Sequence, residues 1–168
     1  MTGGASKVIY DRIVESCANK LGPLGFSRRG FILRKMANGN TAIIEFQRST
    51  KSNQRETRFT INLGVICKDI LDEGQPTPAQ ASSANAHLRQ RIGVLLPGRP
   101  DKWWVIEPKT DVDALEAEVS NLIVEVAVPY LEPYLDSNAL AELWASGKSP
   151  GLTEKQRLEY LTKLNADR

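Results

Sequence analysis

The stretch Arg58-Phe59-Thr60-Ile61-Asn62-Leu63-Gly64-Val65-Ile66-Cys67 decides how the rest of this chain can be arranged. Apolar side chains occupy every second position, and Thr60, Asn62 and Gly64 stand between them. A period of two is typical of a β-strand with one buried face. Because the segment is long for a strand, we expect it to lie in the middle of a sheet, with the other elements packed on it.

Composition predicts one globular domain. The chain has 168 residues, of which 41% are hydrophobic and 25% are charged, which is enough for a substantial core. No apolar run approaches the ~20 residues needed to cross a bilayer, and residues 1–6 contain no apolar signal region. We therefore expect a cytoplasmic protein with no membrane partner. Cys17 and Cys67 fall on apolar faces and read as small buried hydrophobes, so neither a disulfide nor a metal or other cofactor is expected.

The segment before the central strand predicts one helix and two strands. A stripe of apolar residues every four positions predicts a helix over residues 6–22, ended by Gly22 and Pro23. Residues 26–35 read as a single strand in which Gly30 marks a bulge. Asn38-Gly39 favours a tight hairpin turn, after which residues 41–49 form the next strand. With the central strand, these segments make an antiparallel meander of three strands.

The segment after the central strand is predicted to be mixed and then helical. Residues 68–83 resemble a loop, residues 84–96 fit either a helix or a strand, with a fourth strand favoured, and residues 102–106 form a short fifth strand or an extended link. Helices are expected from about residue 111 to Pro129, from about 137 to 144, and from 154 onward. The predicted fold class is therefore α+β: an antiparallel sheet of about four or five strands with helices packed on one face. Residues 1–147 form its single domain, and residues 148–168 form a peripheral C-terminal helix.

An ordered series of short motifs runs through the chain. It consists of Gly25-Phe26-Ser27-Arg28-Arg29-Gly30, Ile44-Glu45-Phe46-Gln47-Arg48-Ser49, Phe59-Thr60-Ile61-Asn62-Leu63-Gly64-Val65, Arg89-Gln90-Arg91-Ile92-Gly93 and Trp103-Trp104. Taken together, the series resembles a bacterial domain-of-unknown-function family over about residues 7–135. The resemblance implies a small α+β domain and brings no established activity, cofactor or catalytic residue.

The polar face of the predicted sheet is the main candidate site. If the strands over residues 41–49 and 58–67 pair, then Gln47, Thr60 and Asn62 share one surface with Glu45 nearby. Amides are poor strand formers, so we expect Gln47 and Asn62 to have a specific role in this sheet. They form either a binding surface with Trp103 or Trp104 as an aromatic wall, or hydrogen bonds to a covering loop or helix. Arg48, His87, Arg89 and Arg91 complete the candidate set.

Charge is unevenly distributed along the chain. Residues 1–70 hold 12 Lys and Arg against 5 Asp and Glu, whereas residues 71–168 hold 10 against 15. The basic residues Arg28, Arg29, Arg34, Arg48, Lys51, Arg55 and Arg58 would crowd neighbouring strands and could bind nucleic acid. The alternative is a basic sheet neutralised by acidic helices, whose charged edge discourages aggregation. Net charge of only +2 favours this second interpretation.

Three functions follow, in order of preference. The first is a non-enzymatic binding or interaction module whose polar sheet face contacts an unknown protein or small molecule. The second is nucleic-acid binding through the basic strands. The third is an enzyme centred on His87, Gln47 and Asn62, although no Gly-x-Ser-x-Gly elbow or glycine-rich phosphate loop is present.

Overall fold

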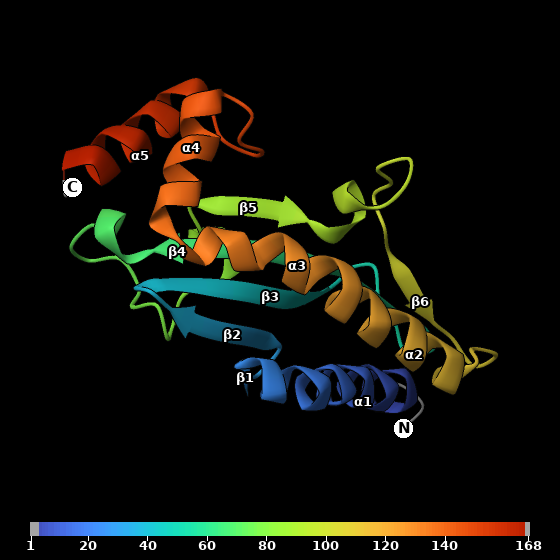
Figure 1. Cartoon of the computed structure of the whole chain (residues 1–168). Helices are drawn as coiled ribbons and strands as arrows, with labels where there is room; N and C mark the ends of the chain where they lie inside the picture. Colours follow the sequence, from blue (N-terminus) through green and yellow to red (C-terminus); the bar gives the residue numbers. More distant parts are fainter. Residues whose placement is uncertain (1–3, 167–168) are drawn as a thin grey trace.

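The computed structural model describes residues 4–166 and has an α+β fold (Figure 1). One antiparallel sheet contains β1 (Ser27–Arg29), β2 (Ile32–Ala37), β3 (Asn40–Arg48), β4 (Thr57–Cys67), β5 (Leu88–Arg91) and β6 (Trp104–Ile106). Its order is β1-β2-β3-β4-β5, and β6 also pairs with β4. The predicted fold class is confirmed.

Strand β4 is central, as its alternating sequence predicted. It pairs with β3 along nearly its whole length, with β5 from Asn62 to Val65, and with β6 from Thr57 to Phe59. The side chains of Phe59, Ile61, Leu63 and Val65 are fully buried in the main core. One strand therefore joins the meander to both later strands of the sheet.

Helices α1 (Gly4–Leu21), α2 (Val112–Leu122) and α3 (Val128–Leu131) cover one face of the sheet. Helices α4 (Ser137–Ser146) and α5 (Glu154–Ala166) lie at the edge of the domain (Figure 1). Helices α1 and α2 run side by side along the sheet (Figure 1), and the apolar stripes of both contribute to the main core. Between α2 and α3 lies a π-helical turn, Ile123–Ala127. This wider turn allows the chain to pass Pro129, which lacks an N–H, without the helix ending there.

The prediction of one strand over residues 26–35 is wrong. The segment is a tight hairpin in which β1 and β2 pair, with Ser27 opposite Arg34 and Arg29 opposite Ile32. Gly30 has φ of 62°, a left-handed conformation that suits a turn. The glycine therefore reverses the chain, and the sheet gains an edge strand. The favoured strand over residues 84–96 exists only as β5, because a 3₁₀ turn, Ile92–Leu95, follows it.

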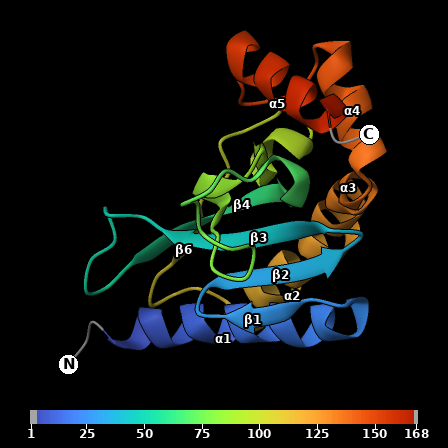
Figure 2. The same ribbon diagram turned by 90° about the vertical axis from the view of Figure 1, so that its left-hand side faces the viewer.

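The second face of the sheet is partly covered by the segment 71–86, here called the strap. Figure 2 shows this segment crossing the sheet on the side turned away from α2 and α3. Ala81 and Ala86 pack there against Ile43 and Ile66, forming a small second core. The strap comes so close that a Cβ on Gly64 would lie 2.7 Å from the Cβ of Ala86. The exposed polar part of this sheet face is therefore limited to the area between the strap and β5.

The C-terminal segment packs on the edge of the domain. Of residues 148–166 only Leu164 is buried, and Tyr160 lies against Trp144 with ring centroids 5.5 Å apart. Lys163 also forms an ion pair with Asp72 of the strap at 2.7 Å. The division of the chain into residues 1–147 and a peripheral helix stays a prediction.

A chain ending at residue 147 should keep a single cooperative unfolding transition. Its free energy of unfolding should fall by about 1.5–3 kcal/mol, the contribution of one buried leucine such as Leu164. Urea denaturation followed by tryptophan fluorescence and by circular dichroism measures both quantities. Transitions that no longer coincide, or loss of the folded baseline, would show that residues 148–168 belong to the domain itself.

Candidate functional site

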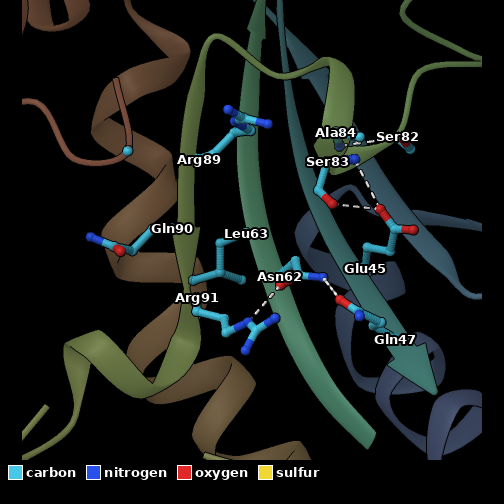
Figure 3. Close-up of a pocket in the computed structure, with 11 residues that line it drawn as sticks. Glu45, Gln47, Asn62, Leu63, Ser82, Ser83, Ala84, Arg89, Gln90 and Arg91 are labelled. Atoms are coloured by element: carbon cyan, nitrogen blue, oxygen red, sulfur yellow. Dashed lines mark hydrogen bonds between the residues drawn. The ribbon is translucent and has the colours of Figure 1, made fainter. Parts of the chain in front are cut away.

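A hollow of about 500 Å³ lies on the second sheet face, between the strap and β5 (Figure 3). We call it the polar hollow. It is lined by Glu45, Gln47, Asn62, Leu63, Ser82, Ser83, Ala84, Arg89, Gln90, Arg91 and Gly151. Strands β3, β4 and β5 supply most of its floor, and the strap supplies one wall. In Figure 3 Gln90 points to the opposite side of β5 from Asn62.

Two amides form the centre of the floor. The register places Glu45 opposite Asn62 and Gln47 opposite Thr60, and the Nδ2 of Asn62 donates a hydrogen bond to the Oε1 of Gln47 at 2.6 Å. The prediction that Gln47 and Asn62 share a face and lie within reach of one another is confirmed. The two amides satisfy each other, instead of bonding the backbone of a covering segment.

Arg91 extends this chain of hydrogen bonds. Its Nε lies 3.4 Å from the Oδ1 of Asn62, and its Nη1 donates to Asp101 at 2.7 Å. The guanidinium also lies over the ring of Trp103, 5.2 Å from the centroid, an arrangement favoured by the ring quadrupole. Hydrogen bonds from Arg91 and Trp103 lower the pKa of the Asp101 carboxyl. Arg91 is thus fixed in position from two sides.

Glu45 binds the strap to the sheet. Its Oε1 accepts hydrogen bonds from the backbone N–H of Ser83 at 2.9 Å and from the Oγ of Ser83 at 2.7 Å. Charge-assisted bonds of this kind are stronger than neutral ones. A covering loop was one of the two roles expected for the polar residues of this face, and Glu45 has that role. Gln47 and Asn62 lie instead on the open floor of the hollow.

Arg89 is the exposed cation of the hollow. Its side chain rises from β5 toward the strap side in Figure 3, and it forms no ion pair with a residue between 4 and 166. The hollow therefore presents a guanidinium from one side and the carboxylate of Glu45 from another.

Several residues of the predicted site do not line the hollow. Thr60 lies opposite Gln47 on the same sheet face, as predicted, but it is buried and donates its hydroxyl to the carbonyl of Lys102 at 2.7 Å. Trp104 is buried in the main core, stacked on Phe59, and its indole N–H donates to Glu118. Trp103 borders the hollow only through Arg91. Arg48 pairs with Phe59 and thus has the opposite parity to Gln47, so it is not part of this surface.

His87 is also outside the hollow. It is 2% exposed, and its Nδ1 accepts a hydrogen bond from the backbone N–H of Cys67 at 2.9 Å. Tyr160 packs against its ring edge-to-face. Burial, followed by the charge of Lys163, lowers the pKa of His87 to about 4. The structure does not bring His87 together with Gln47 and Asn62, so these three residues do not form the single site that the third hypothesis requires.

Sequence reasoning missed the strap residues Ser82 and Ser83 and the counter-ion Asp101. A capping-box arrangement of Ser82 and Asn85 starts a short 3₁₀ turn, Ser83–Asn85, and could have been recognised as a local turn signal. Its docking on Glu45 is a long-range contact with no local signature.

The fold and the hollow define a small α+β domain with a polar, open pocket on its sheet. Residues 17–133 match the model of a family described as a domain of unknown function, DUF4304, and the chain belongs to this family. No curated protein and no solved structure matches the chain.

Two further observations concern the described part of the chain. None of the helices between residues 4 and 166 combines the length and apolar character that a membrane span requires. The same residues contain no group of three or more His, Cys, Asp or Glu side chains placed to hold a metal ion.

Proposed function

We propose that this domain is a non-enzymatic binding module and that the polar hollow accepts a small polar ligand. The observation that carries the proposal is the convergence of side chains from three adjacent strands and the strap on one hollow of about 500 Å³. This volume lies within the range typical of small-molecule sites, ~300–1,000 Å³. A rigid sheet suits such a site because it holds its side chains in fixed positions.

The groups left without partners suggest the chemistry of the ligand. Oε1 of Gln47 accepts from Asn62, which leaves its Nε2 for a ligand. Oε1 of Glu45 is occupied by Ser83, so the second carboxylate oxygen can accept a donor. Arg89 supplies a positive charge without an ion-pair partner in residues 4–166. A ligand with an anionic group near Arg89 and a hydrogen-bond donor near Glu45 matches this set.

The simplest probe of this chemistry is a zwitterion. We expect glycine, titrated into ¹⁵N-labelled protein, to shift the side-chain amide resonances of Gln47 and Asn62 and to do so saturably. Acetate and methylamine, which each carry half of the required charges, should shift them less. Gln47→Ala and Arg89→Gln should weaken binding by about tenfold or more, since a hydrogen bond to a charged group contributes ~1.5–3 kcal/mol.

Thermal denaturation separates binding from structure. Gln47 is exposed and Arg89 is exposed, so both variants should melt within about 1–2 °C of the parent, as surface changes usually do. Lys51→Gln, an exposed change in the loop after β3, is the matched charge control and should bind normally. No shift of either amide with any of the three probes, or a marked drop in melting temperature for both variants, contradicts the binding site.

A further inference from the structure

A second hollow, of about 530 Å³, lies at the β1–β2 edge of the sheet, beside the middle of the strap. We call it the arginine hollow. Arg28, Arg29 and Arg34 line it together with Ser27, Met36 and Ala79, and no carboxylate is among its lining residues. Arg29 and Arg34 also line an adjoining depression with Ala79 and Gln80. Arg29 and Arg34 lie on the face of this hollow, because the register places Arg34 opposite Ser27, two residues from Arg29. Arg28 pairs with Leu33 and has the opposite parity. Two guanidinium groups therefore face a space that has no carboxylate among its lining residues.

Arg34 is the unusual member of this group. It is only 8% exposed, and its Nε and Nη2 both donate to the same acceptor, the carbonyl oxygen of Ala81, at 3.1 and 2.6 Å. It forms no ion pair within residues 4–166. Burying a cation against one neutral carbonyl is costly. Burial and the charge of Arg29 both lower the pKa of Arg34, the first more than the second.

The carboxylate on this face forms no ion pair with Arg34. Glu45 favours the charged form of Arg34 from a distance, and its Oε1 accepts hydrogen bonds from Ser83. Arg28 is partly occupied as well, since its Nε donates to the carbonyl of Gly30 at 2.8 Å. Arg29 and Arg34 therefore have no ion-pair partner within residues 4–166, and their free N–H groups can bind an anion.

We propose that the arginine hollow binds a phosphate-type oxyanion, held by Arg34 from the buried side and by Arg29 from the exposed side. Guanidinium groups match phosphate oxygens with paired N–H donors. Two cations beside one hollow fit a doubly charged phosphate better than a singly charged carboxylate. The site is separate from the polar hollow, and its proposal does not depend on the function proposed there.

Inorganic phosphate is the probe that tests this site. At constant ionic strength maintained with KCl, phosphate should shift the Nε–H resonances of Arg29 and Arg34 saturably at millimolar concentrations, whereas acetate should do so more weakly. Arg29→Gln should weaken phosphate binding by about tenfold or more. Because Arg29 is exposed and does not contact the strap carbonyl, this variant should fold normally. Arg34→Lys keeps one charge but loses the paired donors, and should weaken binding as well.

Two comparisons decide the outcome. Lys51→Gln changes the net charge equally and should bind phosphate as the parent does. Absence of saturable binding, equal responses to phosphate and KCl, or unchanged affinity in Arg29→Gln would overturn the proposal and leave Arg34 as a tether for the strap. A single-stranded oligonucleotide that binds far more tightly than phosphate, with a steep dependence on salt, would overturn it in favour of a nucleic-acid surface.

Discussion

Leu63→Ala should lower the free energy of unfolding by about 2–5 kcal/mol, the range found when a fully buried leucine is truncated. Leu63 is 0% exposed and lies in the central strand. Its neighbours belong to a core built from both α1 and α2 as well as the sheet. Because those elements are anchored on β4 from several directions, the cavity cannot easily be closed by movement of one of them. Urea denaturation at constant pH measures the change.

Leu158→Ala is the matched control for this experiment. The same atoms are removed, but Leu158 is 47% exposed on α5, so a loss below about 1 kcal/mol is expected. If Leu63→Ala also cost less than about 1 kcal/mol, the assignment of β4 as the strand that organises the core would be wrong.

The main layers of this fold could be predicted because their signals are local. The alternation in β4 and the four-residue spacing of apolar residues in α1 each reveal which face is buried. The Asn38-Gly39 pair likewise marks the β2–β3 turn, where both residues have positive φ. By contrast, β1 has only three residues, all exposed. So short a strand has no periodicity of its own, and the sequence therefore predicts a bulge at Gly30 where the structure has a turn.

The candidate site was predictable only where it follows from strand parity. Gln47 and Asn62 had to share a face once Phe46 and Ile61 were placed in the core. The alternation of side chains along a strand does not predict that the strap covers Glu45 or that Asp101 pairs with Arg91. Both contacts join separate segments of the chain, and only the complete fold brings these segments together. Either Trp103 or Trp104 was a candidate for the aromatic wall, since one of two adjacent tryptophans in a strand must face the core and the sequence does not say which; Trp104 is the buried one.

His87 carries the other large expected effect, on the pH dependence of stability. It is enclosed by the backbone of Cys67, whose N–H donates to its Nδ1, and by the ring of Tyr160. The charged groups that act on it are Lys163, which opposes protonation, and Asp72, which favours it. These two form an ion pair with each other, so their effects partly cancel. Burial is therefore the dominant cause of the lowered pKa.

The sign of the effect follows from the two pKa values. An unfolded histidine takes up its proton near pH 6.5, whereas His87 in the folded protein does so only near pH 4. Above pH 6.5 both states are neutral, and His87 adds no pH dependence. As the pH falls from 6.5 toward 4, the unfolded chain binds a proton that the folded chain does not, so the free energy of unfolding decreases. The full loss is roughly 3 kcal/mol, of which about 2 kcal/mol is reached by pH 5.

His87→Asn should remove this dependence. Asparagine keeps a side-chain acceptor for the N–H of Cys67 but does not titrate. We expect the free energy of unfolding of the variant to change less than that of the parent between pH 7 and pH 5, by about 2 kcal/mol. Subtracting one curve from the other cancels the carboxylates, which titrate in both proteins. Parallel curves would mean that the ring of His87 can be protonated in the folded state, and that the packing of Tyr160 against it opens readily to water.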